Sequence, residues 1–386
     1  MIKKMYYIAN ARMPNEKAHG IQIAKMCEAF AEAGENVVLV VPGRGSPSAD
    51  LRSFYQLRVD ISLVRLQVPD LYTCGRTGFL VSSVLFMMRC VFFLFEKRIR
   101  GERFLIYTID MDTFSTMVLP LLGMCVTEIH APKKATAVQR FFFKHVRGVV
   151  ATNALTKASL AKTFSFPLPR MIVEPNGVDA QMFASFMPKD EARRRLSLPP
   201  AEKIALYVGR LYPWKGLEIL PVVCEKLVKN GISCYVVGGT AEELERLSGN
   251  DLPPNLHCVG AKAARDIPAW IAASDVALVL GTAHNEESYR FTSPMKLFEY
   301  MASRIPMVAS GTPALKDVLT DRDALFYEPD NPASLAQRIT EAVTHSKENA
   351  VRVNRAYEKA QEHTWGERAQ RILAFCAFVA GRAKTV

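Results

Sequence analysis

Two cations follow a predicted strand in the second half of the chain, at a spacing that suits a diphosphate. The apolar run 203–208 leads into Gly209-Arg210, and Lys215-Gly216 follows after a short turn. Glycine lets a ligand approach the backbone, and a helix starting near Gly216 would offer free N–H groups to an anion. Arg210 and Lys215 would then hold a diphosphate from one strand end. The competing interpretation is that both side chains are solvated, as is usual for Arg and Lys.

A second motif, Ser293-Pro294-Met295-Lys296, predicts another helix N-terminus that could face an anion. Ser293 suits the N-cap and Pro294 the first helical position, so the helix dipole and exposed N–H groups would favour negative charge. Glu299 comes later on the same predicted helix. A carboxylate there can accept two hydrogen bonds from a vicinal diol such as a ribose. The alternative for Glu299 is an exposed surface ion pair.

A regular alternation of short apolar runs and helical patterns must position these groups. The runs rich in β-branched residues predict strands at 5–9, 37–41, 61–66, 104–109, 126–130, 149–152, 172–174, 203–208, 234–237, 257–259, 276–280, 307–309 and 324–327. Helical patterns lie between them, for example at 21–33, 217–229 and 334–344. This alternation predicts βαβ units and parallel sheets covered on both faces. Because so many strands exceed one ordinary open sheet, we expect an α/β chain with two doubly wound domains.

The break between the two domains is expected near 176–200. A strand there ends in Pro175-Asn176-Gly177, and a charged stretch runs into Leu198-Pro199-Pro200. Proline and glycine at this density indicate a loop or linker.

Length and composition agree with two globular domains. The chain has 386 residues, of which 49% are hydrophobic and 23% charged, and this excludes a disordered, collagen-like or coiled-coil protein. The eight cysteines form no C-x-x-C pair, so we expect no zinc ribbon and reduced thiols in a cytoplasmic protein. The N-terminal residues are expected to form a strand, not a signal peptide.

The net charge of +11 is unevenly distributed along the chain. Residues 1–185 hold 23 Lys and Arg against 14 Asp and Glu, whereas residues 186–386 hold 26 against 24. This asymmetry indicates an anionic partner for the first half, such as phospholipid headgroups or phosphorylated acceptors. The alternative is that the basic surface only aids solubility.

Two apolar or aromatic segments of the first half could bear on a membrane. Residues 79–95 are strongly apolar but contain Arg89, so we favour a largely buried helix over one lying on a membrane surface. Ser82, Arg89 and Glu96 would form one polar stripe on that helix. Residues 138–146 are similarly basic and aromatic, and neither segment is expected to span a membrane.

Together these motifs resemble the nucleotide-sugar site of the GT-B glycosyltransferases, in particular the retaining family 4. The resemblance covers almost the whole chain. Its most specific parts are Gly209-Arg210 with Lys215-Gly216, the run Thr292 to Ala302, Pro175-Asn176-Gly177-Val178-Asp179 with Phe183, and the opening Lys17-Ala18-His19-Gly20-Ile21. It implies two Rossmann-like domains facing each other across a cleft, with the C-terminal helix, Trp365–Arg382, crossing back to the first.

The resemblance also implies the roles of the domains. Residues 1–178, with the C-terminal segment 363–386, would bind the acceptor, and residues 179–362 would bind the nucleotide sugar. The acceptor would be a lipid-linked or lipopolysaccharide-type glycan at the cytoplasmic membrane face. Nucleic acid is not expected as a partner, because the sequence contains no recognition-helix or stacking motif.

Individual residues take roles by the same resemblance. Arg210 and Lys215 would neutralise the diphosphate and its developing charge, a large catalytic contribution, and Glu299 would hold the ribose. The backbone at Val259-Gly260 would meet the base. Further implied donor contacts come from the loop at Gly20, from Gly209, from the turn Ser293-Pro294-Met295-Lys296, and from His130, which matches a histidine that contacts the donor sugar. A lone histidine at a strand end is otherwise more often structural.

The chain departs from the family pattern at one position. A second glutamate usually lies eight residues before the ribose-binding one, and here that position is Phe291. Glu286 or Glu287 could substitute for it. Two alternatives to the transferase remain open: an epimerase of the same fold, or a nucleotide-sugar-binding subunit without activity.

Asp110-Met111-Asp112 resembles the metal-binding D-x-D of GT-A glycosyltransferases, in which paired carboxylates hold Mg²⁺ or Mn²⁺ against a diphosphate. Three-residue patterns arise often by chance, and a one-domain GT-A fold leaves residues 203–309 unexplained. We therefore expect no metal and no cofactor beyond the nucleotide-sugar substrate.

Overall fold

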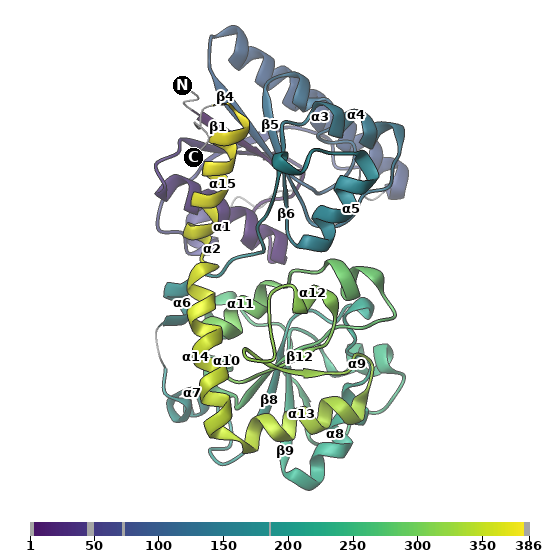
Figure 1. Cartoon of the computed structure of the whole chain (residues 1–386), viewed down its shortest axis with the longest axis vertical. Helices are drawn as coiled ribbons and strands as arrows, with labels where there is room; N and C mark the ends of the chain where they lie inside the picture. The colour runs from purple at the N-terminus through teal and green to yellow at the C-terminus, as the bar shows by residue number, and fades with distance from the viewer. Residues whose placement is uncertain (1–3, 45–49, 72–73, 185–186, 382–386) are drawn as a thin grey trace. The chain divides into compact units, whose positions relative to one another are not determined.

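The computed structural model describes residues 4–44, 50–71, 74–184 and 187–381. The chain divides into two compact units, each with its own parallel sheet (Figure 1). Unit 1 comprises Met1–Asn176 and Trp365–Val386, and unit 2 comprises Gly177–Thr364. The chain therefore leaves unit 1 after Asn176 and returns to it at Trp365.

Unit 1 is built on a seven-stranded parallel sheet with the order β3-β2-β1-β4-β5-β6-β7. Its strands are β1 (Lys4–Ile8), β2 (Val37–Pro42), β3 (Ser62–Leu66), β4 (Phe104–Ile109), β5 (Met124–Ile129), β6 (Gly148–Ala151) and β7 (Met171–Val173). The central strands are buried on both faces, which explains why they appear in the sequence as continuous apolar runs.

Helices cover both faces of this sheet. They are α1 (Ala18–Glu32), α2 (Leu51–Tyr55), α3 (Gly75–Ile99), α4 (Ala137–His145), α5 (Ala154–Phe164) and α15 (Trp365–Val379), with short 3₁₀ turns η2 (Leu119–Leu121) and η3 (Leu168–Arg170). Helices α1 and α15 pack together on one face. On the other face, α3, α4 and α5 share one apolar core with the strands, which includes Phe86, Phe142 and Leu160.

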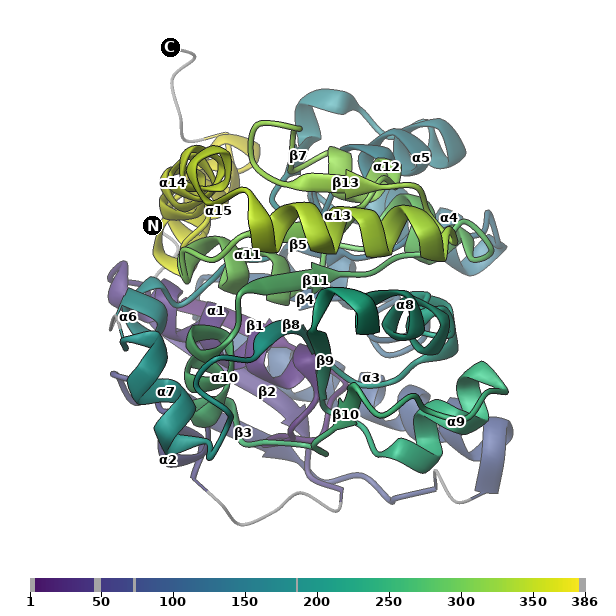
Figure 2. The ribbon, with the colours of Figure 1, turned by 90° about the horizontal axis from the view of Figure 1, so that it is seen from below.

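Unit 2 has a six-stranded parallel sheet with the order β10-β9-β8-β11-β12-β13. Its strands are β8 (Lys203–Val208), β9 (Ile232–Val237), β10 (Leu256–Cys258), β11 (Val276–Val279), β12 (Met307–Ser310) and β13 (Leu325–Tyr327). Its helices are α6 (Ala180–Ala184), α7 (Lys189–Arg195), α8 (Leu220–Leu227), α9 (Ala241–Ser248), α10 (Ile267–Ala273), α11 (Met295–Ala302), α12 (Pro313–Lys316), α13 (Pro332–Thr344) and α14 (Ser346–Glu362). Figure 2 shows α8 and α13 on one side of this sheet and α10 and α11 on the other.

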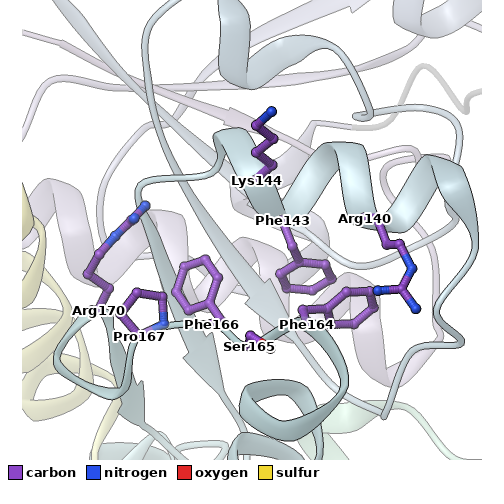
Figure 3. Close-up of a pocket in the computed structure, with 8 residues that line it drawn as sticks. All are labelled: Arg140, Phe143, Lys144, Phe164, Ser165, Phe166, Pro167 and Arg170. Carbon is purple, nitrogen blue, oxygen red and sulfur yellow. The ribbon is translucent and has the colours of Figure 1, made fainter.

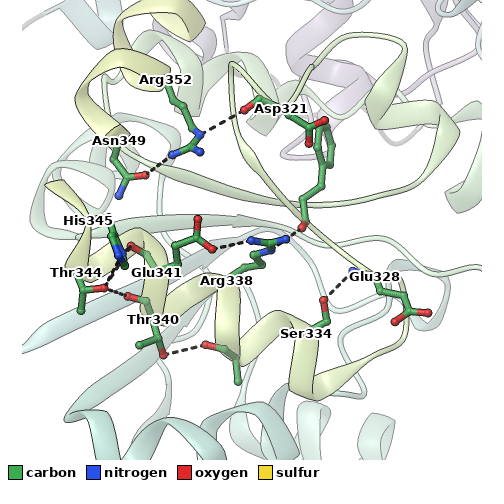
Figure 4. Close-up of polar contacts among 12 residues, drawn as sticks. Asp321, Glu328, Ser334, Arg338, Thr340, Glu341, Thr344, His345, Asn349 and Arg352 are labelled. Atoms are coloured by element: carbon green, nitrogen blue, oxygen red, sulfur yellow. Dashed lines mark hydrogen bonds and ion pairs between the residues drawn. The ribbon is translucent and has the colours of Figure 1, made fainter. Parts of the chain in front are cut away.

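Helix α14 backs α11 and is anchored by the corner that joins it to α13 (Figure 4). Arg338 on α13 donates from Nε to the Phe326 carbonyl on β13, at 3.1 Å. At the start of α14, Asn349 donates from Nδ2 to the Ala342 carbonyl, and Arg352 donates to the Asp321 carbonyl. The first bond ties α13 to the sheet, and the other two tie α14 to α13 and to the turn before β13.

The predicted fold class is confirmed, since the chain forms two Rossmann-like parallel sheets. All thirteen predicted strands are present, displaced by no more than two residues at either end. The last predicted helix, 365–382, runs over Trp365–Val379 and packs in unit 1, while Arg382 lies outside the described residues.

The prediction that residues 79–95 form a largely buried helix is wrong. Only one side of α3 is buried, and Leu80, Met88 and Phe92 lie exposed on its other side. The expected polar stripe is also interrupted, because the Ser82 hydroxyl is buried and donates to the Pro69 carbonyl.

Candidate functional site

The turn after β8 brings a lysine amine close to a glycine backbone. Gly209 has φ +141°, a conformation that favours glycine, and its N–H donates to the Val237 carbonyl at 2.8 Å. A Cβ at this position would lie 3.2 Å from Tyr207 Oη and 3.6 Å from Lys215 Nζ. The glycine therefore leaves space between the Lys215 amine and the Tyr207 hydroxyl.

The helix expected to start near Gly216 begins later. A 3₁₀ turn, η4 (Pro213–Lys215), comes first and is ended by Gly216 at φ +73°. Helix α8 starts only at Leu220. The left-handed glycine reverses the chain, so the N–H groups predicted to face an anion at Gly216 do not belong to a helix N-terminus.

Lys215 is held in an aromatic and cationic environment. Its Nζ donates to the Arg210 carbonyl at 3.3 Å and lies 5.0 Å from the ring centre of Tyr212 and 5.5 Å from that of Trp214. Burial and, after it, the nearby Arg210 charge lower the pKa of Lys215 to about 8. The Arg210 side chain is exposed and makes no ion pair among the described residues.

Lys296 reaches the same place from α11. Its Nζ lies 3.7 Å from the Tyr207 ring centre, shielded from solvent, and has no hydrogen-bond partner among the described residues. Tyr207 Oη also has none. Burial and then repulsion by Lys215 hold the pKa of Lys296 well below its ordinary value, against the opposing effect of Glu299. Two ammonium groups thus approach Tyr207, and neither forms an ion pair with a carboxylate in the described part of the chain.

The N-terminus of α11 differs from the prediction by one residue. Pro294 is extended, with ψ 125°, and is the residue that precedes the helix, which starts at Met295. Ser293 lies one residue before this position, so the prediction that it is the N-cap is wrong. Pro294 therefore occupies the N-cap position that was expected for Ser293.

Glu299 lies one turn beyond Lys296 on α11 and is half-buried. Burial raises the pKa of Glu299 to about 7, although Lys296 acts in the opposite direction. The next residue fixes the helix to the sheet, since the Tyr300 hydroxyl accepts a hydrogen bond from the Val208 N–H at 2.9 Å. Lys296 and Glu299 are therefore positioned by a direct anchor to the end of β8.

Val259-Gly260 follows β10 and adjoins the ends of the neighbouring strands. The Val259 N–H donates to Val236, and the Gly260 N–H donates to Gly239. Both N–H groups are engaged within unit 2, so neither of them can donate to a base. Gly260, at φ +71°, has open space where a Cβ would stand.

In unit 1, His130 follows β5 and contacts a buried carboxylate. Its Nε2 lies 2.9 Å from Glu128 Oε1, and 31% of the His130 side chain is exposed. Glu128 also accepts hydrogen bonds from the Tyr107 hydroxyl and from the Arg368 guanidinium of α15, at 2.6 and 2.8 Å. Arg368 overcomes the effect of burial and holds the pKa of Glu128 well below its ordinary range.

Gly20 was expected in a loop, and this is wrong, because it lies in the first turn of α1. A Cβ there would come within 2.6 Å of the Tyr55 hydroxyl and 2.7 Å of the Asn15 side chain. Packing inside unit 1 therefore explains this glycine.

Both carboxylates of the D-x-D sequence, Asp110 and Asp112, contact other groups of the protein. Asp110 forms an ion pair with Lys133. Asp112 accepts hydrogen bonds from the Asn10 side chain at 2.6 Å and from two backbone N–H groups of its own turn at 2.8 Å. These contacts give both residues a structural role.

The region of the missing family glutamate forms a single π-helical turn, η7 (Glu287–Phe291). Glu286 and Glu287 are exposed and Phe291 is half-buried. Whether either carboxylate serves a donor sugar stays a prediction.

The structure thus brings Gly209, Arg210, Lys215, Lys296 and Glu299 together around the carboxyl end of β8. The sequence did not identify Tyr207 as a site residue, because a tyrosine within an apolar strand is expected to be part of the hydrophobic core. The Glu128–Arg368 pair was also missed, and its partners lie 240 positions apart in the sequence.

Comparison with known proteins places these observations in context. Residues 202–345, within unit 2, match the family described as glycosyl transferases group 1. A putative teichuronic acid biosynthesis glycosyltransferase, TuaC of Bacillus subtilis, is 25% identical over 152 residues, 39% of this chain and 36% of its own. A D-inositol 3-phosphate glycosyltransferase of Xylanimonas cellulosilytica is 25% identical over 246 residues, 58% and 55% of the two chains. The chain thus spans about a third to a half of the length of these curated relatives.

Solved structures match over almost the full chain. A glycosyltransferase from Rickettsia africae has a TM-score of 0.75 at 14% identity and covers 99% of this chain and 100% of its own. HepE of Anabaena, in complex with UDP-glucose, has a TM-score of 0.70 at 15% identity, with 97% and 99% covered. At such identities the likeness shows the fold alone, which is the two-domain α/β fold of the GT-B glycosyltransferases.

Proposed function

We propose that the protein is a glycosyltransferase in which unit 2 binds a nucleoside-diphosphate sugar and the sugar passes to an acceptor hydroxyl. The observation that carries the proposal is the convergence of Lys215 and Lys296 on Tyr207 without a paired carboxylate. Buried charges are normally paired with an opposite charge, and neither ammonium group forms an ion pair with a carboxylate among the described residues, so together they suit an anionic ligand.

A diphosphate has the charge and size that these groups lack. It would accept hydrogen bonds from Lys215 and Lys296, and the exposed Arg210 guanidinium could close over its outer oxygens. When the bond to the sugar breaks, negative charge grows on the departing diphosphate. The same cations would stabilise that charge in a partly buried site, where such stabilisation is large.

Glu299 would hold the ribose of the donor. Its half-buried carboxylate has a raised pKa because burial disfavours its charge. Two ribose hydroxyls donating to it would replace the lost solvation and favour the ionised form. The unit 2 match to glycosyl transferases group 1 supports this assignment, as does the fold shared with HepE, which was solved with UDP-glucose.

The finer features of the reaction belong to the same proposal. We expect transfer with retention and without a metal, in which an oxygen of the diphosphate takes the acceptor proton and the protein contributes mainly positioning. His130, held by Glu128, would contact the donor sugar. The acceptor would be a glycan or lipid-linked molecule bound by unit 1 at the cytoplasmic membrane face. The eight unpaired cysteines agree with a reducing compartment.

The test is thermal denaturation with UDP-glucose, GDP-mannose and ADP-glucose, each against the sugar-free nucleotide. A bound ligand at 100 times its Kd adds about 2.7 kcal/mol to the stability, so one base should raise Tm clearly. The rise should be lost in Lys296→Met and in Glu299→Gln but kept in Lys226→Met, an exposed lysine of α8.

Product analysis then separates the chemistry. Release of the nucleoside diphosphate that depends on an added glycan acceptor supports the transferase. An epimerised nucleotide sugar formed without acceptor, or binding with no turnover for any acceptor offered, would contradict it in favour of an epimerase or a binding subunit.

A further inference from the structure

The outer side of α3 carries a continuous apolar stripe. Val81, Leu85, Met88, Phe92, Phe95 and Ile99 recur at alternating spacings of four and three residues and therefore share one face of the helix. Leu85 is half-buried. The other five are exposed: Val81 by 42%, Met88 by 46%, Phe92 by 66%, Phe95 by 53% and Ile99 by 70%. We call these six residues the α3 stripe.

Packing of α3 in unit 1 does not account for the stripe. The core uses the opposite side of the helix, where Phe86, Cys90 and Leu94 are fully buried against the sheet. By length and composition alone α3 could cross a membrane, since its most apolar 18-residue stretch has a mean hydropathy of 2.1. Because the inner face of α3 is packed in the core of unit 1, the helix would have to lie along a membrane surface and not across the membrane.

A basic pocket lies on the same side of the sheet as the stripe. It has a volume of about 270 Å³ and is formed by α4 and by residues 164–170 (Figure 3). Its rings are Phe143, Phe164 and Phe166, and the first two stack at 4.1 Å. Helices α3 and α4 both pack against η2 and share one core with the sheet, so the pocket and the stripe belong to the same helical layer of unit 1.

Three cations surround these rings. Figure 3 shows Arg170 at one end of the row of rings and Arg140 at the other, with Lys144 above them. Arg140 and Lys144 are exposed, one helical turn apart, and make no ion pair among the described residues. Arg170 donates to the Arg147 and Val146 carbonyls at the end of α4, which fixes its guanidinium at the pocket.

The sequence around the pocket strengthens its positive charge. Residues 129–173 contain eight Lys and Arg and no Asp or Glu. Among the described residues, Lys133 is the only one of these eight cations that forms an ion pair with a carboxylate, and its partner is Asp110. The electrostatic potential at the pocket is therefore positive, because almost none of these cations is neutralised by a neighbouring carboxylate.

We propose that this surface docks unit 1 on an anionic phospholipid bilayer, with the α3 stripe in the interfacial region and a lipid phosphate in the basic pocket. Apolar side chains beside lysines and arginines are the combination that binds such interfaces. A second copy of this chain would bring Arg89, Arg140 and Lys144 against the same cations, and this repulsion argues against self-association. Docking would give the proposed function access to a lipid-linked acceptor, but vesicle binding itself requires no nucleotide sugar.

The test is flotation of the full chain with vesicles of phosphatidylcholine alone and of phosphatidylcholine mixed with phosphatidylglycerol. We expect binding to the mixed vesicles that weakens as salt is raised, because the cations are exposed. The double variant Phe92→Glu/Phe95→Glu should lose binding to both kinds of vesicle. Val351→Glu, at a residue of α14 that is 62% exposed, should bind like the wild type.

A second pair of variants tests the pocket. Arg140→Glu/Lys144→Glu should lose the preference for anionic vesicles, with at least about fivefold weaker binding for each cation removed. Lys226→Glu/Lys229→Glu on unit 2 makes the same change of charge elsewhere and should retain the preference. All four changed sites are exposed, so circular dichroism melting should match the wild type.

Three outcomes would overturn the inference. They are equal binding to both kinds of vesicle, unchanged binding by the Phe92/Phe95 variant, or a wild-type dimer in light scattering that this variant converts to monomers. The thermal shift with a nucleotide sugar should be the same for all these variants. Its absence in a wild type that still floats would contradict the proposed function only.

Discussion

Each unit holds a cluster of charged groups shielded from water, and the two clusters are arranged in opposite ways. In unit 1, Glu128 is matched by Arg368 and further bonded by Tyr107 and His130. In unit 2, Lys215 and Lys296 approach each other without a paired carboxylate. A matched cluster stabilises a structure, whereas an unmatched cluster of cations suits the anion binding proposed above.

The titration behaviour of the clusters reflects this difference. Folding lowers the pKa of Glu128 and raises that of Arg368, so the native state favours both charges. Folding lowers the pKa of Lys215 and Lys296 and raises that of Glu299, so the native state of unit 2 disfavours its charges. Perturbed pKa values of this kind are common at functional sites, which agrees with the proposed role of this cluster.

The largest effect is expected from Arg368→Met, which leaves Glu128 buried and unpaired. Breaking such a pair should reduce the free energy of unfolding by about 3–5 kcal/mol. Chemical denaturation followed by tryptophan fluorescence would measure it. Arg100→Met removes an exposed pair with Glu96 and should cost less than about 1 kcal/mol. Equal losses for the two variants would show that the matched cluster is not structural, and Glu128→Gln/Arg368→Met should recover part of the stability.

Lys296→Met should affect donor binding instead of stability. It removes an unpaired shielded charge, so the free energy of unfolding should stay equal or rise. Donor affinity should fall by about 10- to 100-fold, the loss of one hydrogen bond to a charged group. Titration calorimetry with the nucleotide sugar identified by thermal shift measures the affinity, with Lys226→Met as the control. A large loss of stability with unchanged affinity would make Lys296 a structural residue.

Donor binding should depend on pH through Lys215. Its folded pKa of about 8 lies below the ordinary value, so the free protein loses this proton above pH 8, where the diphosphate still requires it. Affinity should therefore fall by up to about tenfold per pH unit above pH 8, and binding there should take up protons. Calorimetry in buffers of different ionisation enthalpy measures the uptake. Lys215→Met should abolish this decline, and a profile that stays the same in the variant would refute the assignment.

The same groups predict how stability changes with pH. The folded pKa of Glu299 is raised to about 7, so its contribution is present at low pH and is lost as pH rises from its unfolded value to about 7. Lys215, whose folded pKa is lowered, makes stability rise with pH between about 8 and its unfolded value. Thermal melts of Glu299→Gln and Lys215→Met across pH should each lack one of these slopes.

The smallest effect on stability is expected from His130→Ala. The imidazole is partly exposed, and Glu128 keeps Arg368 and Tyr107 as partners. The free energy of unfolding should change by no more than about 1 kcal/mol. The rate of sugar transfer should fall, while binding of the sugar-free nucleotide should not. An effect on nucleotide binding as large as that of Lys296→Met would contradict a role at the sugar.

The sequence predicts the framework well because its strands are short, apolar and regularly spaced. Local turns are less predictable, as Gly216 ends a 3₁₀ turn instead of opening a helix and Pro294 delays α11 by one residue. Lys215 and Lys296 could be named from their motifs. Their convergence on Tyr207 could not, because it depends on how α11 packs against the end of β8.

Long-range pairing lies beyond such prediction for a related reason. Neither Glu128 nor Arg368 carries a local signal that identifies the other, since their contact arises only when α15 returns to the first sheet. Likewise, the apolar composition of α3 predicts burial, but a single helix has only one side to bury. Its exposed stripe follows from the position of the helix in the outer layer of unit 1.

The return of α15 to unit 1 also has a consequence for synthesis. On the ribosome, Glu128 is made 240 residues before Arg368. At typical elongation rates this delay lasts about 10–50 s. During that time the nascent first sheet contains an acidic side chain whose basic partner does not yet exist, while residues 177–364 of unit 2 are translated. Completion of the N-terminal half therefore waits for the last helix to be translated.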